Sequence, residues 1–250
     1  MNTSPTQESL SQRLLTWFQH HGRHDLPWQQ APNAYRIWIS EIMLQQTQVN
    51  TVIPYYQRFV QRFADIQTLA QAPLDTILHY WSGLGYYARA RNLHRAAQEV
   101  VQYHQGQLPK ELESLMRLPG IGRSTAAAIL ALSHDQRQPI LDGNVKRVLC
   151  RYCALAGWPG EPRVAKQLWQ LAAYHTPEHA VRAYTQAIMD LGATVCTRRA
   201  PLCQRCPLNQ DCLAYQHHQV DAFPKPKPRK KLPVRTTLFL MLHNPQGAVL

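Results

Sequence analysis

Leu118-Pro119-Gly120-Ile121-Gly122 stands between two segments with helical patterning, residues 111–116 and 123–133. Pro119 and Gly120 interrupt the first helix, and Gly122 lets the chain enter the second. This order predicts a helix-hairpin-helix. Backbone N–H groups beside glycines at a helix N-terminus are unhindered donors to a phosphate oxygen, and they read no base sequence. We therefore expect Gly120 and Gly122 to bind a nucleic acid backbone.

The composition points to the same kind of partner. The 250 residues include 27 Lys plus Arg and 15 Asp plus Glu, a formal charge of +12. A basic excess of this size indicates a polyanion, most simply nucleic acid. The run from Lys225 to Arg235 contains six of these cations, but the rest of the chain still has 21 against 15 acids.

Membrane and export signals are missing from the sequence. Apolar runs fall short of the roughly 20 residues that span a bilayer, and the N-terminus lacks a basic-then-apolar signal pattern. We expect a cytoplasmic, DNA-associated protein that does not bind membranes.

Helical periodicity dominates the sequence, and strand-like alternation is nearly absent before residue 235. This pattern predicts an all-α protein. The first helix is expected to start at Ser4, and Leu10, Leu14, Trp17 and Phe18 share its apolar face. Further helices are expected near residues 33–44, 49–63, 66–70, 73–81, 88–104, 145–153, 162–174 and 177–191.

The C-terminal end has a different pattern. Residues 223–233 alternate Pro with Lys or Arg, which is typical of an extended linker. Residues 234–242 read as a strand, 244–247 as a turn and 248–250 as the start of a returning strand. One unfinished hairpin is unstable alone, so we expect a second domain to begin here and to be truncated.

Four cysteines lie on one short stretch, with six, two and five residues between them: Cys196, Cys203, Cys206 and Cys212. In a reducing compartment such a set favours metal ligation over disulfides. Zinc sites more often use two short-spaced pairs, whereas a compact loop with unequal gaps favours a four-iron cluster. The spacing therefore favours iron–sulfur, with zinc as the alternative and a metal-free loop third.

Other residues near these cysteines have simpler interpretations. Cys150 and Cys153 fall among apolar neighbours, so we expect inert core thiols. Arg198, Arg199 and Arg205 lie in the cysteine loop, where they contact either phosphate or solvent.

Two acids stand out as candidate catalytic groups. Glu41 lies in an apolar helical run, where desolvation raises a carboxyl pKa and keeps it protonated, as a general acid requires. The alternative is a structural carboxylate paired with an arginine, a role that Asp190 fits better. Asp142 precedes the helix that opens at Asn144, where it would cap the helix and stay ionised. Lys146 would favour that ionised form, or would contact solvent or phosphate.

Such a pair of acids can cleave a glycosidic bond: one protonates the leaving group and the other stabilises the sugar cation. A base inside a duplex must first be extruded, and a side chain must fill the gap. Gln45 and Tyr86 are candidates for this wedge. Tyr86 could instead be a core aromatic, because Tyr87 beside it can take either role.

Together these residues resemble the adenine DNA glycosylases of the MutY type, within the helix-hairpin-helix superfamily that includes endonuclease III. The resemblance covers nearly the whole chain and rests on Leu26-Pro27-Trp28, Ser40 to Val49, Gly83 to Arg89, Leu118 to Gly122, Leu141 to Arg147 and the cysteine loop. It implies a six-helix module with the hairpin (27–137), an iron–sulfur helical module (1–26 and 138–222), a linker (223–234) and the start of a truncated Nudix-like domain (235–250).

The resemblance also implies roles for single residues. Glu41 matches the acid that protonates adenine, Asp142 the carboxylate that stabilises the sugar cation, and Asn144 its hydrogen-bonding neighbour. Gln45 and Tyr86 match duplex-inserting residues. The four cysteines match the ligands of a [4Fe-4S] cluster.

Ser124 bears on the type of reaction. Bifunctional relatives such as endonuclease III have a lysine there that attacks the sugar, so Ser124 implies a monofunctional glycosylase. The implied substrate is adenine mispaired with 8-oxoguanine or guanine in double-stranded DNA, bound by a monomer. One alternative is a DNA-binding iron–sulfur module with structural acids. The other is a pyrimidine-lesion glycosylase, which the combination of Ser124 and Glu41 disfavours.

Overall fold

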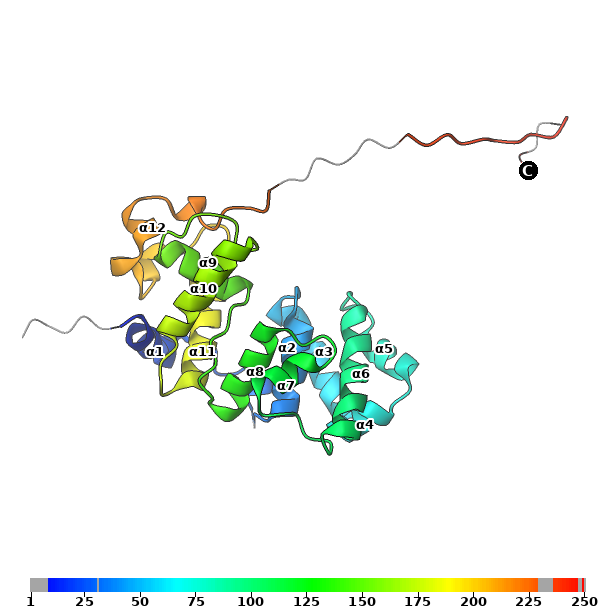
Figure 1. Cartoon of the computed structure of the whole chain (residues 1–250), viewed down its shortest axis with the longest axis horizontal. Helices are drawn as coiled ribbons and strands as arrows, with labels where there is room; N and C mark the ends of the chain where they lie inside the picture. The colour runs from blue at the N-terminus through cyan, green and yellow to red at the C-terminus, as the bar shows by residue number, and fades with distance from the viewer. Residues whose placement is uncertain (1–8, 31, 229–235, 247–248, 250) are drawn as a thin grey trace, which may run out of the picture.

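The structure of the chain is a computed structural model that describes residues 9–30, 32–228, 236–246 and 249. Its described residues form helices arranged in two lobes, which confirms the predicted all-α class (Figure 1). The lobe at the right of Figure 1 contains α2 (Ala34–Leu44), α3 (Val49–Arg62), α4 (Ile66–Gln71), α5 (Leu74–Trp81), α6 (Ala88–Tyr103), α7 (Leu112–Arg117) and α8 (Arg123–His134).

The other lobe joins the two ends of the helical region. Helix α1 contacts α11 although most of the chain separates them in sequence. The helices of this lobe are α1 (Leu10–His21), α9 (Gly143–Tyr152), α10 (Pro162–His175), α11 (Val181–Asp190) and α12 (Leu213–Gln216). Shorter elements are the 3-10 turns η1 (Pro27–Gln29), η3 (Cys203–Arg205), η4 (Asn209–Asp211) and η5 (Val220–Ala222), and the π-helical turn η2 (Leu191–Val195).

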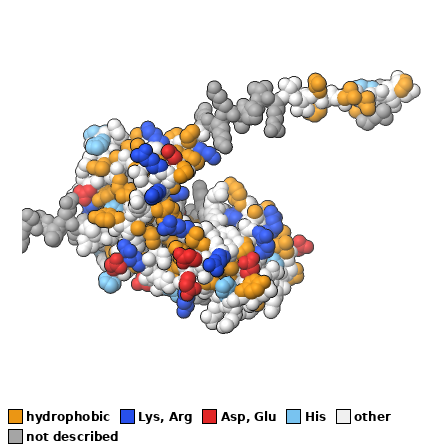
Figure 2. Space-filling view, in the orientation of Figure 1, with side chains coloured by type: hydrophobic (Ala, Val, Ile, Leu, Met, Phe, Trp, Pro, Cys, Tyr) orange, Lys and Arg blue, Asp and Glu red, His pale blue; other side chains and the backbone are white. Residues whose placement is uncertain are grey.

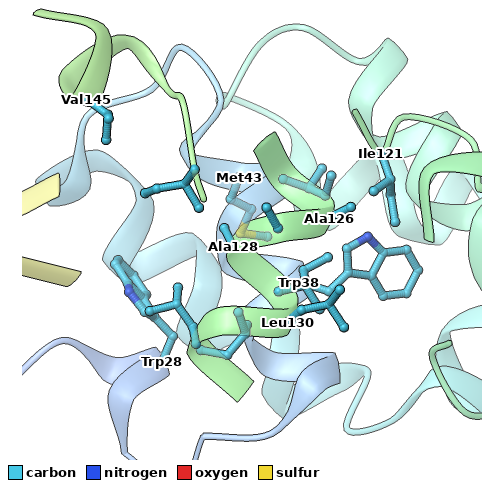
Figure 3. Close-up of a cluster of buried hydrophobic side chains, with 14 of the residues drawn as sticks. Trp28, Trp38, Met43, Ile121, Ala126, Ala128, Leu130 and Val145 are labelled. Carbon is cyan, nitrogen blue, oxygen red and sulfur yellow. The ribbon is translucent and has the colours of Figure 1, made fainter. Parts of the chain in front are cut away.

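Helix α8 lies at the centre of the molecule and contacts α2, α7 and α11. The sequence predicted one apolar face on it, formed by Ala126, Ile129, Leu130 and Leu132. That prediction is too narrow, because every residue from Ala126 to Leu132 is buried. Small alanine side chains let the neighbouring helices approach closely, so the middle of α8 is buried on every face. Figure 3 shows Ala126, Ala128 and Leu130 of this helix among other buried side chains, including Trp38 and Met43.

Two helix boundaries differ from the prediction. The expected start at Ser4 lies outside the described residues, and α1 begins at Leu10 with Ser9 and Gln12 forming a capping box. The four apolar residues predicted for its inner face are all buried. Helix α11 begins at Val181 rather than at residue 177. The Arg137 guanidinium donates to the Thr176 carbonyl, which holds the preceding segment as a loop.

The C-terminal segment is not folded as predicted. Residues 236–242 were expected within a strand, but in this described segment they form none. The Leu238 and Phe239 side chains are 94% and 92% exposed. An antiparallel bridge joins His243 to Val249 across the expected turn. Single hairpins need neighbouring strands for stability, which explains the difference. The expectations for residues 229–235, 247–248 and 250 fall outside the described residues.

Within the described ranges, every helix is too short or too polar to cross a membrane.

Candidate active site

A cleft of about 980 Å³ contains five of the residues predicted from the sequence. Its lining comes from the end of α2, the α2–α3 loop, the start of α8, the start of α9 and the α11–η2 segment. Lys and Arg side chains lie on both lobes beside the hollow that separates them in this view (Figure 2). The five predicted residues in the lining are Glu41, Gln45, Ser124, Asp142 and Asn144.

Glu41 is partly buried and belongs to the last turns of α2. Its neighbours Ile42 and Met43 anchor the helix in the core, with exposures of 2% and 0%. Burial, and then the charge of Asp142, raises the pKa of the Glu41 carboxyl to about 8. Among the described residues, the ion pairs involve other carboxylates. Glu41 is therefore protonated at neutral pH and is not the arginine-paired structural acid of the alternative.

Asp142 caps α9. Its Oδ1 accepts a hydrogen bond from the Val145 backbone N–H at 2.7 Å, and its Oδ2 accepts one from the Asn144 side-chain amide at 3.3 Å. Burial raises the pKa of Asp142, while these hydrogen bonds and the charge of Arg147 oppose the rise. The cation that favours the ionised form is thus Arg147, while the role of Lys146 stays a prediction. The net direction of the Asp142 pKa is upward, which differs from the expectation that the helix cap alone keeps Asp142 ionised, because packing around the start of α9 buries the carboxyl.

Arg147 was given no role by the sequence, although it ends one of the motifs. Its Nη2 donates to Asn144 Oδ1 at 2.8 Å, and its Nε donates to the Cys196 carbonyl at 2.7 Å. Gly192, in η2, lets the π-helical turn approach α9, because a Cβ there would lie 2.6 Å from the Asn144 Cβ. The beginning of α9 is therefore held against the segment that leads into the cysteine loop.

The hairpin between α7 and α8 is anchored by buried Leu118 and Ile121. Gly120 has φ +80°, and a Cβ there would lie 2.9 Å from the Asn92 Cβ, so a larger residue would be strained and crowded. Gly122 caps α8 and has open space on the side where a Cβ would point. The open space is therefore at Gly122, beside the N-terminus of α8.

Gln45 and Tyr86 follow different helices. Gln45 is the C-cap of α2, and its side-chain amide lies 3.4 Å from the Thr125 hydroxyl. Tyr86 precedes α6 with φ +48° and is 58% exposed, which excludes the alternative of a core aromatic. Tyr87 is also exposed, at 40%. Tyr86 therefore lies at the surface, and Gln45 lines the cleft.

Asp190 has the structural role that its sequence context predicted. It is fully buried, and its Oδ1 accepts from the Arg23 Nε at 2.9 Å and from the Gln186 side chain at 2.8 Å. Arg23 also donates its backbone N–H to Oδ2 at 2.7 Å. This network joins the segment after α1 to α11, and the predicted role of Asp190 as a buried carboxylate paired with an arginine is confirmed.

The cysteine loop contains the four predicted ligands. In the described part of the chain, groups of three or more His, Cys, Asp or Glu side chains do not converge on a point where a metal ion would sit. The thiols still influence one another. Burial raises the pKa of the Cys206 thiol to about 12. The other three thiols contribute to this rise, and a hydrogen bond from the Leu208 N–H opposes it. Four cysteine sulfurs on one loop are the donor set of an iron–sulfur cluster or of a zinc site, and a bound metal centre would replace the protons that these thiols retain.

The surroundings of the loop also fit such a group. Buried Arg151 donates to the Cys196 Sγ at 3.4 Å and to the Thr197 carbonyl. Hydrogen bonds and positive charge beside sulfur ligands stabilise a negatively charged thiolate cluster. Burial raises the pKa of Cys150 to about 11, in agreement with an inert thiol. Arg198, Arg199 and Arg205 are exposed.

The sequence profile described as "HhH-GPD superfamily base excision DNA repair protein" matches residues 39–173, more than half of the chain. An adenine DNA glycosylase of Buchnera aphidicola from Schizaphis graminum is 45% identical over 232 residues, which cover 93% of this chain and 67% of that protein. The chain belongs to the adenine DNA glycosylase family. The mouse adenine DNA glycosylase is also 45% identical, over 82% of this chain and 42% of its own length.

Solved structures of other DNA glycosylases share this fold. A thermostable thymine-DNA glycosylase superposes with a TM-score of 0.75 at 28% identity, covering 83% of this chain and 95% of its own. A non-covalent endonuclease III–DNA complex superposes with a TM-score of 0.70 at 19% identity, covering 83% and 94%. The second likeness shows the fold alone. The family assignment confirms a DNA glycosylase enzyme and disfavours a non-catalytic DNA-binding module.

Proposed function

We propose that this glycosylase hydrolyses the N-glycosidic bond of adenine mispaired with 8-oxoguanine or guanine in double-stranded DNA. The observation that carries the proposal is the pair of carboxyl groups in one cleft: burial raises the pKa of Glu41 to about 8, and Asp142 accepts hydrogen bonds from two donors that favour its charged form. Adenine leaves poorly as an anion, so its departure needs a proton, and the sugar that remains needs a negative charge nearby. The two carboxyl groups supply these two requirements.

The reaction then follows from the two protonation states. The Glu41 carboxyl gives its proton to a ring nitrogen of adenine, and the bond from the sugar carbon to adenine breaks with its electrons going to the base. The Asp142 carboxylate stabilises the oxocarbenium-like sugar until water adds and loses a proton. Asn144 positions Asp142, because its amide donates to Oδ2.

Access to the base requires that the nucleotide leave the duplex. Gly120, Gly122 and Lys146 are proposed to bind the phosphate backbone, and the open space at Gly122 supports this. Gln45 and Tyr86 are proposed to fill the gap that the extruded nucleotide leaves. The exposure of Tyr86 and the position of Gln45 in the cleft lining support the wedge roles.

Ser124 supports monofunctional chemistry. It lines the cleft, but its hydroxyl is used to accept a hydrogen bond from the Leu141 backbone N–H at 3.0 Å. An amine at this position would attack the sugar and lead to strand cleavage, as a lysine nucleophile does with a carbonyl carbon. A serine that caps a backbone N–H leaves water as the nucleophile.

Cys196, Cys203, Cys206 and Cys212 are proposed to hold a [4Fe-4S] cluster. When bound, such a cluster cross-links the loop through four thiolates and gives it a fixed shape. The module boundaries expected from the sequence, a monomeric state and a cytoplasmic, DNA-associated location are part of the same proposal.

Release of free adenine tests the proposed function. A duplex with one adenine opposite 8-oxoguanine is incubated with the protein, and the released base is separated and quantified, with a thymine opposite guanine duplex as the matched control. We expect adenine release from the first duplex and none of thymine from the second. Tight binding to both duplexes without base release would show a DNA-binding module instead, and release of thymine would favour a pyrimidine glycosylase.

A further inference from the structure

Arg89 occupies an unusual position for a cation. It lies in the first turn of α6 and is only 9% exposed. In the described chain its guanidinium has no carboxylate partner within ion-pair distance. A buried, unpaired charge is costly unless strong hydrogen bonds satisfy it. Its hydrogen-bond partners therefore show which segments of the fold this side chain stabilises.

The first set of contacts is with the end of α2. The Arg89 Nη1 donates to the carbonyl oxygens of Ile42 at 3.0 Å, Met43 at 2.7 Å and Gln45 at 2.5 Å. Carbonyls in the last turn of a helix lack helical partners and carry the negative end of the helix dipole. Arg89 thus stabilises the last turn of α2, on which Gln45 is the cap.

The second set of contacts is with the α2–α3 loop and the α5–α6 turn. The Arg89 Nη2 donates to the Thr47 hydroxyl at 3.2 Å, and to the Leu84 and Gly85 carbonyls at 3.3 and 3.4 Å. The guanidinium also lies 5.4 Å from the centroid of the Tyr86 ring. One side chain therefore binds both segments that present the candidate wedges.

Both segments have backbone conformations that need support. Gln46 has φ +60° and Tyr86 has φ +48°, in the left-handed region that non-glycine residues seldom adopt. Residues 45–47 and 84–86 belong to different parts of the chain, and their relative position depends on contacts between them. The planar guanidinium has several donors in a fixed arrangement, which suits it to set a distance between two loops.

We infer that Arg89 is a positioning residue that fixes Gln45 and Tyr86 relative to each other for insertion into the duplex. The inference rests on the proposed function, in which these two side chains replace the extruded nucleotide. Arg89 touches neither the base nor the sugar in this scheme. Its loss should slow extrusion of the nucleotide and leave the chemical step intact once the base is outside the stack.

The test compares Arg89→Lys with the wild-type protein on two duplexes. One has adenine opposite 8-oxoguanine with 2-aminopurine as its neighbour, whose fluorescence rises on unstacking, and the other has the same adenine inside a three-nucleotide unpaired bubble. Lysine keeps the charge but has one compact donor group that cannot reach both loops. Arg95→Lys, an exposed change on the same helix, is the matched control.

We expect Arg89→Lys to slow both the fluorescence rise and the release of adenine from the mispair by about tenfold or more. A rate change of this size corresponds to the loss of one hydrogen bond from a charged donor. Release from the bubble should stay near the wild-type rate. In a Gln45→Ala, Tyr86→Ala background, Arg89→Lys should add little further loss. Thr47→Val, which removes one acceptor of Arg89, should give the same pattern at smaller size, and it replaces Arg89→Lys if that variant fails to fold.

Equal losses on both duplexes with a normal unstacking signal would overturn the inference, as would a full additional loss in the double-alanine background. If the wild-type protein unstacks the duplex but releases no adenine, the proposed function fails. The positioning role of Arg89 is then tested by the rate of the fluorescence rise alone. If the wild-type protein produces no unstacking, the wedge roles and the inference both fail.

Discussion

The Ser124 hydroxyl accepts a hydrogen bond from the backbone N–H of Leu141 at 3.0 Å, so the first turn of α8 holds the residue that precedes Asp142. Ser124→Ala would leave the N–H of a buried residue without this partner, which costs about 1–3 kcal/mol. We expect a loss of that size in the free energy of unfolding, measured with urea, together with slower adenine excision. Ser124→Thr keeps the hydroxyl and should be close to wild type. If both variants were equally stable, this hydrogen bond would be unimportant.

Monofunctional chemistry gives a second prediction. After incubation with an adenine mispair, the product strand should contain an abasic site and stay intact until it is heated in alkali. A denaturing gel run with and without alkali separates the two cases. Strand breaks at neutral pH, at the rate of base release, would contradict the role proposed for Ser124.

The pKa of Glu41 predicts how stability depends on pH. The folded protein keeps the Glu41 proton up to about pH 8, whereas an ordinary Glu carboxyl loses it near 4.5. Between these values folding takes up a proton, so this residue makes the free energy of unfolding fall by about 1.4 kcal/mol per pH unit as pH rises. Glu41→Gln lacks this dependence and should become increasingly more stable than wild type from pH 5 to pH 8. A constant difference in unfolding free energy across that range would argue against a raised pKa.

The cysteine loop predicts a visible chromophore. Protein purified without oxygen should be brown, with broad absorption at roughly 400 nm that is typical of thiolate–iron charge transfer. Cys203→Ser should lower the iron content, folding yield and DNA affinity together, whereas Cys150→Ser, a change in a core thiol, should leave the iron content unchanged. Colourless protein with one zinc ion per chain would support the zinc alternative.

Much of the fold followed from patterns within single segments. Helical periodicity located α1 to α11, and the Pro and Gly residues at 119–122 located the hairpin, because both signals act over a few residues. The enclosure of α8 could not be foreseen, since an Ala-rich helix looks amphipathic until the helices around it are known. The predicted strand near residue 240 has the right alternation, but its formation depends on neighbouring strands.

In the candidate site, too, residues with a local sequence signal were predicted, and residues whose roles depend on contacts between elements were not. Glu41 and Asp142 were singled out by local signals, an apolar helix and a helix start, and the structure places both in one cleft. The raised pKa of Asp142 was not foreseen, because its burial depends on packing against other elements. Arg89 and Arg147 were given no role, because their partners lie on other elements, and arginines on a basic protein carry no local signal. The sequence suggested Lys146 as a cation near Asp142, and it could not indicate Arg147, which donates to Asn144 and lowers the pKa of Asp142.

The division of labour between the two acids is tested most directly by single-turnover excision with the Glu41→Gln and Asp142→Asn variants, at protein concentrations that saturate DNA binding. Glu41→Gln keeps the shape of the side chain but has no proton to transfer, so adenine release should cease while binding is retained. Asp142→Asn removes the charge that faces the sugar cation and should slow release by about 10²-fold or more. Near-wild-type release by either variant, with binding unchanged, would show that its residue is structural and would contradict the two-carboxylate mechanism.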